Sequence, residues 1–294
     1  MRKKTAILFS AAFLIYIPVM CFLYSCKMQK EPEAKGVRAD NLSSGPVTEV
    51  PWQDDEEFKK AIEKNGTNVL LAAYRTVLKD PLPGEEYNVH LGARMMAGTV
   101  LKEGEIFSQN NNIGPYIESR GYREGPTYSG VNLIKTIGGG VCKIASTLYN
   151  VSIMSNLEIV ERRNHSMPVP YVPYGQDATV SYGNVDFRFK NSTNEPLLIW
   201  AQGVDNTLYI AFYGKEKPPK VEWHHDILEI QKAQEIYKKN KSLPQGTKKI
   251  ILEGMDGATV KSWVTIEKSD GTIETKQLGT SYYKPMSSIV EVGE

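Results

Sequence analysis

A run of three glycines, Gly138–Gly140, leads directly into the apolar segment 141–155, which carries Cys142. Glycine lets the backbone turn sharply and lets another chain segment approach closely. Ile144 and Leu148 lie four residues apart, and this spacing predicts a helix of about four turns over 141–155. The sequence therefore predicts a thiol at the start of a helix, immediately after a tight turn.

The N-terminal segment 1–26 has the pattern of an export signal. Basic residues at 2–4 precede an uncharged apolar run over 5–25. Two interpretations are open: a signal-anchor helix, since about 20 apolar residues span a bilayer, and a bacterial lipoprotein signal that is cleaved before Cys26 and lipidated there. Both predict a protein that is anchored to the bacterial cell membrane and faces its extracytoplasmic side.

This topology isolates one thiol. The chain has three cysteines, and Cys21 and Cys26 both lie in the N-terminal segment. Cys142 is then expected to be the only cysteine in the exported folded part, where it has no intrachain disulfide partner. An unpaired cysteine outside the cytoplasm is buried, bridged to another chain, or reactive.

Composition divides the remainder of the chain. Residues 27–51, rich in Glu, Pro, Ser and Gly, are expected to form a disordered tether. Residues 52–217 are expected to form an α+β domain, 218–246 a polar linker, and 247–294 a small β-module. A hairpin of about 48 residues buries too little apolar surface to be stable alone, so the module must pack on another surface or be stretched out.

Local patterns predict the elements. The expected fold class is α+β, with the helix that carries Cys142 packed on an antiparallel sheet, and a C-terminal all-β module. A hairpin turn is expected at Ser269–Gly271. Apolar spacing predicts further helices over 54–66, 68–78 and 85–101, and alternation predicts antiparallel strands over 177–183, 185–192, 196–204 and 207–215.

A thiol at a helix start has reactive character. The helix dipole there favours the thiolate and lowers its pKa, and the backbone N–H groups can stabilise an oxyanion. We therefore take Gly139, Gly140 and Lys143 as the residues that form the turn and the oxyanion surroundings of Cys142. The competing interpretation is that Cys142 is a small buried residue that permits close packing.

A thiol nucleophile needs a base and a group that orients the base. His165 is the candidate base, and Asp177 or Asp186 is the candidate orienting group. The order Cys, His, Asp is the one found in papain-like and transglutaminase-like thiol enzymes, an analogy at the level of the fold. Arg162 and Arg163 are expected to be solvated charges on a strand face.

Other classes of site are not indicated. The four histidines do not have zinc-ligand spacing, so no metal site is expected. The glycine run lacks the Lys-Ser/Thr of a phosphate-binding loop, and no cofactor is expected. The net charge is +1 without a basic stripe, so nucleic acid is not an expected partner.

Several strings taken together resemble the VanW family over residues 86–202. The resemblance implies an exported bacterial cell-envelope protein, of a family with one member in vancomycin-resistance clusters, but it implies no established reaction. Cys142, His165 and Asp177 fall on matching family positions, whereas Lys143 stands where the family usually has Gln. The strings are GEIFSQNNNIGPYIESRGYREGPTY, GGGVCKIASTLYN, LEIVERRNHSMPVPYVPYGQDATVSYGNVDFRFKN and PLLIWA.

The C-terminal segment is similar to the small five-glycine module that often follows VanW domains and is thought to bind wall sugars. The glycines that carry this resemblance are Gly254, Gly257, Gly271, Gly279 and Gly293.

The resemblances favour a non-catalytic role in binding or scaffolding at peptidoglycan, with a link to glycopeptide resistance. The alternative is a thiol-dependent enzyme, of transpeptidase, amidase or transglutaminase-like type, that acts on cell-wall peptides through Cys142 and His165. The expected partners are a wall peptide or glycan, and the membrane through the N-terminus.

Overall fold

The computed structural model describes residues 42–78, 83–129 and 132–294. The N-terminal signal or anchor, the lipidation of Cys26 and the first part of the predicted tether lie outside these residues. In the part of the chain that is described, no helix has the length and apolarity needed to cross a membrane.

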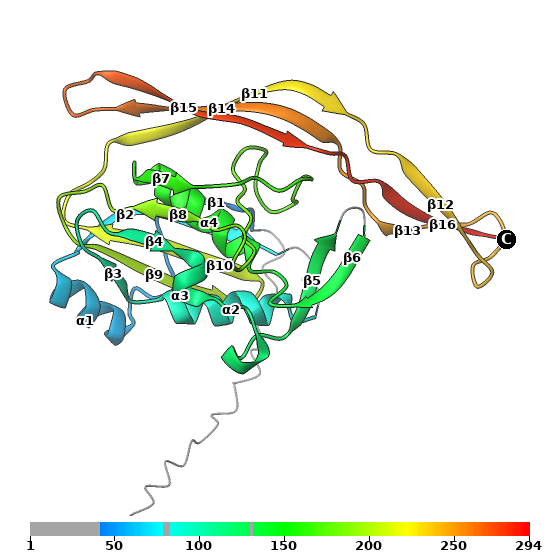
Figure 1. The fold of residues 1–294 in the computed structure, drawn as a ribbon, viewed down its shortest axis with the longest axis horizontal. Helices are drawn as coiled ribbons and strands as arrows, with labels where there is room; N and C mark the ends of the chain where they lie inside the picture. Colours follow the sequence, from blue (N-terminus) through cyan, green and yellow to red (C-terminus); the bar gives the residue numbers. More distant parts are fainter. Residues whose placement is uncertain (1–41, 79–82, 130–131) are drawn as a thin grey trace, which may run out of the picture. The chain divides into compact units, whose positions relative to one another are not determined.

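A five-stranded antiparallel sheet forms the centre of the first part of the chain (Figure 1). Phe212 of β10 and Leu197 of β9 are fully buried. The strand order is β1 (Gly45–Pro46), β2 (Val69–Val77), β10 (Thr207–Gly214), β9 (Leu197–Val204) and β3 (Thr99–Leu101).

Helices cover both faces of this sheet. On one face, α2 (Glu85–Met96) packs on β9, and α4 (Cys142–Met154) packs on β2 and β10. The buried residues Ile144 and Leu148 of α4 belong to this core, and each contributes about 1.5–3 kcal/mol by its burial. On the other face, α1 (Glu56–Asn65) and Trp52 form a second cluster. The expected fold, a helix with Cys at its N-terminus on an antiparallel sheet, is confirmed.

The helix predicted over 54–66 is also confirmed. The side chain of Asp55 accepts hydrogen bonds from the backbone N–H groups of Glu57 and Phe58 at 2.7 and 3.0 Å and so caps α1. Gly66 ends the helix in the left-handed conformation, with φ of 64°.

The helix predicted over 68–78 is wrong, because this segment is strand β2. It lies between β1 and β10, and both of its faces are covered: Tyr74 packs in the cluster with α4, and Ala73 packs in the cluster with Trp52. A strand buried on both faces reads as a short continuous apolar run, which periodicity alone does not distinguish from a buried helix.

The folded part starts earlier than residue 52. Residues 45 and 46, within the predicted tether, pair with β2. The N–H of Val47 donates to the carbonyl of Ala73 at 3.0 Å, and the N–H of Val77 donates to Ser44 Oγ at 2.9 Å. A polar, Gly- and Pro-containing segment of this kind is typical of a tether, but its backbone groups bind the edge of the sheet.

Smaller elements surround α4. The strand predicted over 177–183 is wrong: this range is irregular, with an isolated bridge between Ser181 and Val185. The N–H of Ala178 donates instead to Ser146 Oγ of α4 at 3.0 Å. The smaller elements are the sheet β4 (Ile106–Ser108), β8 (Arg188–Lys190) and β7 (Glu158–Glu161), the hairpin β5 (Glu124–Ser129) and β6 (Asn132–Ile137), helix α3 (Gln109–Ile113) and a 3-10 turn (Glu118–Arg120).

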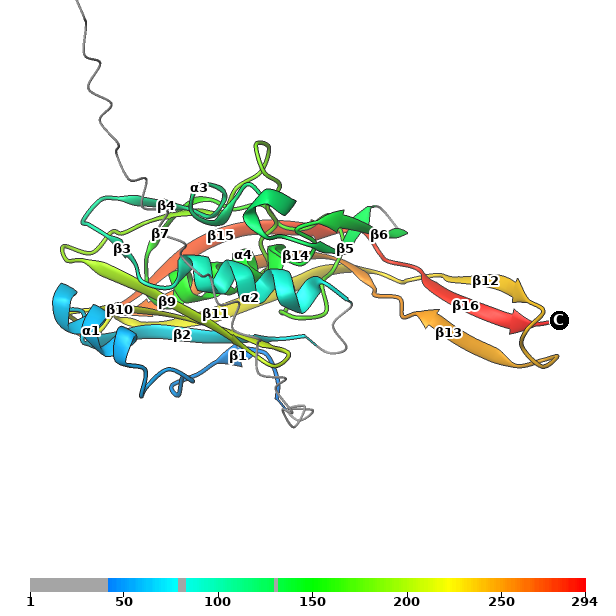
Figure 2. The ribbon, with the colours of Figure 1, turned by 90° about the horizontal axis from the view of Figure 1, so that it is seen from below.

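The C-terminal part is all β (Figures 1 and 2). The predicted hairpin turn is confirmed, since β14 and β15 pair on either side of it. The first sheet has the order β11 (Lys220–Gln231), β14 (Gly257–Glu267) and β15 (Ile273–Tyr283), and the second has the order β12 (Glu235–Asn240), β16 (Ser288–Gly293) and β13 (Lys248–Leu252).

Two further findings concern this β-region. The linker predicted over 218–246 is wrong, because β11 and β12 occupy most of it. The charged residues of this range suggested a solvated linker. The range instead contains strand β11, in which Trp223 packs against the core. Val264 and Ile266 of β14 are buried in the same core cluster as the side chains of α4. The β-region therefore packs on the first part of the chain, as its small size requires.

Candidate thiol site

The three glycines shape the turn that precedes α4. Gly138 and Gly140 have φ of +79° and +101°, a region that favours glycine. Gly139 lies against the backbone of Gly125 in β5, where an added Cβ would be 2.2 Å from the carbonyl carbon and oxygen. Asn88 of α2 donates to the carbonyl of Gly139 at 2.9 Å. The turn thus fixes the start of α4 against α2 and β5.

Cys142 is the first residue of α4 and is a half-buried free cysteine. Its Sγ lies 3.4 Å from Thr179 Oγ1 and accepts from the N–H of Val180 at 3.5 Å. A protonated thiol also reaches the carbonyl of Val180, at 3.6 Å. The sulfur is therefore in a polar environment at a helix N-terminus, rather than sealed in apolar packing.

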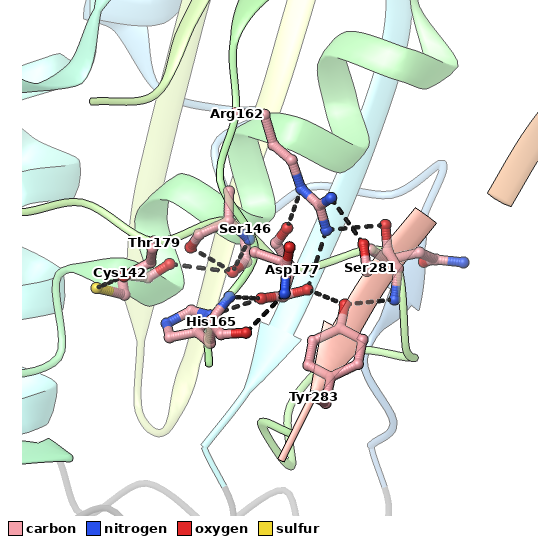
Figure 3. A network of polar contacts seen from close by, with 12 residues as sticks. Cys142, Ser146, Arg162, His165, Asp177, Thr179, Ser281 and Tyr283 are labelled. Atoms are coloured by element: carbon pink, nitrogen blue, oxygen red, sulfur yellow. Dashed lines mark hydrogen bonds and ion pairs between the residues drawn. The ribbon is translucent and has the colours of Figure 1, made fainter. Parts of the chain in front are cut away.

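His165 and Asp177 lie together, although 12 residues separate them. Asp177 Oδ2 is 2.6 Å from His165 Nδ1 and accepts from the backbone N–H of His165 at 2.6 Å. Figure 3 shows His165 between Cys142 and Asp177. The side chain of His165 is 16% exposed, whereas that of Asp177 is 1% exposed. The imidazole is therefore partly accessible, and the carboxylate beside it is buried.

The electrostatics favour charge separation between thiol and imidazole. Burial raises the pKa of Cys142, but hydrogen bonding and charge interaction with His165 outweigh it and lower the pKa to about 7. Burial lowers the pKa of His165, but its hydrogen bonds to Asp177 and Cys142 outweigh that effect and raise the pKa to about 9. Between these values the pair is a thiolate and an imidazolium.

Asp177 has further partners. Arg162 Nη2 lies 3.1 Å from Asp177 Oδ1, and Tyr283 OH donates to the same oxygen at 2.5 Å. Burial raises the pKa of Asp177, but the hydrogen bond from His165 and the charge of Arg162 hold it below its ordinary value. The carboxylate is therefore ionised and held from several directions.

Sequence analysis missed two of these partners. Arg162 was expected to be solvated, but its side chain is 12% exposed and pairs with Asp177. Its position three residues before His165 was the feature of the sequence that could have indicated a place in the site. Tyr283 lies 106 residues from Asp177, and no local pattern connects them.

Asp186, the other candidate for orienting His165, serves elsewhere. It accepts from Ser108 Oγ at 2.5 Å and from the N–H of Asn110 at 3.0 Å. Asp186 therefore supports the start of α3, and the structure brings Asp177 to His165 instead.

Lys143 does not have the geometry of an oxyanion donor. Its backbone N–H donates to the carbonyl of Gly140 at 3.0 Å. Its ammonium group pairs with Glu85 and lies 4.9 Å from the centre of the Tyr171 ring. Lys143 is buried, and its pair with Glu85 joins α4 to the first turn of α2. This is a structural role for the residue that departs from the family pattern.

A cavity lies elsewhere in the molecule, away from Cys142, His165 and Asp177. A cavity of about 940 Å³ is lined by β1, β2 and the segment before β11, and none of Cys142, His165 and Asp177 lines it. Among the residues that the structure describes, no three His, Cys, Asp or Glu side chains form a group able to hold a metal ion.

Comparison with known proteins gives two family matches. Residues 84–213 match the model described as VanW like protein, and residues 227–294 match the G5 domain. The second match begins inside β11, within the range that we had expected to be a linker.

Two curated relatives and one solved structure are among the proteins to which this chain is similar. The uncharacterized protein YoaR of Bacillus subtilis is 36% identical over 146 residues, covering 50% of this chain and 48% of its own. The vancomycin B-type resistance protein VanW of Enterococcus faecalis is 28% identical over 137 residues, covering 45% of this chain and 50% of its own. A solved G5 domain of an IgA1 protease is 22% identical over 27% of this chain and 95% of its own, with a TM-score of 0.17.

The chain thus spans about half the length of the curated relatives it matches. Together, the family models account for the region around Cys142 and for the β-region that packs beside it. The chain carries a VanW-like domain over residues 84–213, followed by a G5 domain over residues 227–294.

Proposed function

We propose that the chain is a thiol-dependent enzyme of the cell wall, in which Cys142 attacks an amide bond of a wall peptide. The observation that carries the proposal is the continuous arrangement of Cys142, His165 and Asp177. The interaction of the thiol with His165 lowers the pKa of Cys142, and the imidazole Nδ1 lies 2.6 Å from a buried carboxylate. These three groups can serve as a nucleophile, a base and a group that orients the base.

The cell wall as the site of action rests on the relatives. One relative is named a vancomycin B-type resistance protein, and the resemblance to the VanW family implies a protein of the cell envelope. The G5 domain is a binding module, and it supplies a means of holding the wall polymer close to the thiol. Neither relative's name specifies a reaction, so the chemistry is argued from the residues alone.

The reaction follows from the protonation states. The Cys142 thiolate attacks the carbonyl carbon of an amide and forms a C–S bond, and negative charge develops on the oxygen at the N-terminus of α4. The C–N bond then breaks, and the His165 imidazolium gives its proton to the leaving amine. A thioester remains on Cys142. Water or a second amine, deprotonated by His165, attacks the thioester and releases the thiolate, which gives hydrolysis or transpeptidation.

Exposure is compatible with this chemistry. Cys142 and His165 are both partly exposed, as residues that act on a substrate must be. Asp177 is buried and has no access to substrate. Asp177 acts on the reaction through His165: it keeps Nδ1 engaged and leaves Nε2 for the proton that is exchanged with the thiol and the leaving group.

The proposal is tested by incubating the purified protein with peptide fragments released from cell walls. Mass spectrometry of the products is expected to show shortened or rejoined peptides, and intact-protein mass is expected to show an acyl adduct on Cys142. Cys142→Ala abolishes both. The matched control is Ser152→Ala on the same helix: its hydroxyl bonds the carbonyl of Leu148 at 2.8 Å, three turns from the thiol.

Two results would overturn the enzymatic proposal. The first is product formation that continues in Cys142→Ala. The second is wall binding by the wild type and by Cys142→Ala with equal affinity and without any product from either. The second result would instead establish the binding or scaffolding role that the resemblance to wall-associated families favours.

A further inference from the structure

Strand β15 of the G5 domain contacts the residues behind the thiol site. We propose that this domain completes the site: Tyr283 and Ser281, both on β15, are positioning residues that hold Asp177 and Arg162 behind His165. This inference rests on the proposed function. It assigns to the C-terminal domain a part in the chemistry that is distinct from binding of the wall.

The hydroxyl group of Tyr283 has a defined hydrogen-bond pattern. It accepts from the backbone N–H of Gly175 at 2.8 Å, and that N–H is able only to donate. The hydroxyl hydrogen is thus left for Asp177 Oδ1, at 2.5 Å. Burial and the charge of Asp177 raise the pKa of Tyr283 well above its ordinary value, so the hydroxyl stays protonated and remains a donor. The ring is 1% exposed and packs beside Tyr174.

Ser281 holds the second partner of the carboxylate. Arg162 Nη1 donates to Ser281 Oγ at 2.9 Å, while Nη2 of the same guanidinium lies 3.1 Å from Asp177 Oδ1. Arg162 Nε donates to the backbone carbonyl of Asp177 at 2.8 Å. The guanidinium is thus held between β15 and Asp177, and Oδ1 is bound by Arg162 and Tyr283 together. Oδ2 is consequently directed at His165.

Strand geometry explains why these two residues act together. Alternate residues of a strand point to the same face, so Ser281 and Tyr283 face the thiol site while Tyr282 points away. Ser281 and Tyr283 are 2% and 1% exposed, whereas Tyr282 is 46% exposed. Figure 3 shows Ser281 and Tyr283 on one strand, on the side of Asp177 opposite to Cys142.

The loop between His165 and Asp177 is also held by the G5 domain. It contains no helix and no strand. The N–H of Lys284 donates to the carbonyl of Ser166 at 2.8 Å. Tyr174 OH donates to the carbonyl of Asp256 at 2.7 Å, and Gln176 Nε2 lies 3.0 Å from Nε2 of His225, which is in β11 just before the G5 domain. Both ends of the loop therefore bind the C-terminal β-region that starts with β11, which fixes the separation of His165 and Asp177.

The test uses the complete protein and three hydroxyl deletions. Tyr283→Phe removes the donor to Asp177 and keeps the ring. Ser281→Ala removes the acceptor for Arg162. Tyr282→Phe is the matched control, since it makes the same chemical change on the outer face of the same strand. The rate of alkylation of Cys142 by iodoacetamide is measured from pH 5 to 10, which gives the pKa of the thiol in each variant.

We expect Tyr283→Phe and Ser281→Ala to raise the thiol pKa, because a loosened Asp177 supports the His165 imidazolium less well. A rise of about one unit reduces the thiolate fraction at pH 7 about fivefold. Tyr282→Phe is expected to match the wild type. The inference is overturned if Tyr283→Phe and Ser281→Ala both give a thiol pKa that is unchanged or lowered.

Failure of the proposed function is a separate outcome. It would appear as a wild-type thiol that titrates at about 8.5, like a free cysteine, and that is insensitive to His165→Gln. A low wild-type pKa that His165→Gln raises, but that neither β15 variant alters, refutes only the role of the G5 domain.

Discussion

Asp177 is a buried carboxylate with three side-chain partners. It binds His165 through one oxygen, and Arg162 and Tyr283 through the other. An ionised group is stable at this burial only because each oxygen is paired. Asp177 therefore affects both the stability of the fold and the protonation state of His165.

Replacement of this carboxylate by an amide is expected to affect both properties. Asp177→Asn leaves Arg162 partly buried without a counter-charge, so we expect a loss of about 3–5 kcal/mol in the free energy of unfolding. We also expect a rise in the Cys142 pKa, since His165 loses the group that raises its own pKa. Urea denaturation and alkylation rates measure the two effects. Asp270→Asn, in the exposed hairpin turn, is the control; an equal loss there would contradict the prediction.

The pH dependence of the thiol follows from the two pKa values. Cys142 is deprotonated above about pH 7, and His165 keeps its proton below about pH 9. We therefore expect alkylation to accelerate as pH rises through 7. Turnover of a wall peptide is expected to be bell-shaped, with a decline above 9 where the leaving amine no longer receives a proton.

The charged groups around the pair are Asp177, Arg162 and Lys143. Burial lowers the pKa of Lys143, whereas the partners of Asp177 outweigh its burial and hold its pKa below the ordinary value. His165→Gln is expected to move the alkylation midpoint upward by more than one pH unit, because the largest effect that opposes burial of the thiol is then lost. A midpoint that stays near 7 in this variant would contradict the assignment of His165.

At the level of elements, the turn before α4 depends on the absence of a side chain at Gly139. An added Cβ at this position meets the backbone of Gly125, which is unable to move without displacing β5. We expect Gly139→Ala to cost ~3 kcal/mol or more. Gly183→Ala, where an added Cβ meets nothing within 4 Å, is expected to cost about 1 kcal/mol from its positive φ alone. Equal costs in thermal or urea unfolding would refute the packing argument.

Elements differed in how well the sequence predicted them. Helices α4 and α1 were predicted because their apolar residues recur at helical spacing, and Gly66 marks the end of α1. Strand β2 was mistaken for a helix because burial on both faces removes alternation. Strand β11 was mistaken for a linker because its outward residues are charged. Its inward residues, such as Trp223, pack against the core, and the sequence alone does not show this contact.

The candidate site was predicted in part for a related reason. Cys142, His165 and Asp177 lie within 36 residues, which include α4, β7 and the irregular segment that follows, and their residue types suggested the chemistry. Arg162 was misjudged because burial decides whether an arginine is solvated or paired. Tyr283 and Ser281 are distant in sequence and chemically ordinary, and only tertiary packing brings them to Asp177.

At the level of the whole molecule, the two family domains share one core. Ile266 of β14 is 4% exposed and belongs to the cluster that contains the residues of α4. We expect Ile266→Ala to lower the free energy of unfolding by about 2–5 kcal/mol. Urea unfolding is followed by fluorescence and by the reactivity of Cys142. We expect Ile266→Ala to lower the urea midpoints of both signals equally. Ile273→Ala, at a 67% exposed position on β15, is the control.

A different outcome would separate the domains. If Ile266→Ala moved the fluorescence midpoint but left the Cys142 midpoint unchanged, the two domains would unfold independently. The shared core would then contribute little to cooperativity.

The hydroxyl of Tyr283 has a consequence for how such chains can be recombined. In a modular protein, a family boundary is a natural place to cut or to exchange one module for another. Here a cut between residues 214 and 227 follows the family boundary but removes two oxygens from behind the Asp177 carboxylate. A chimera with a new C-terminal module would therefore need a donor at the same place, and the functional unit extends past the border that the family models draw.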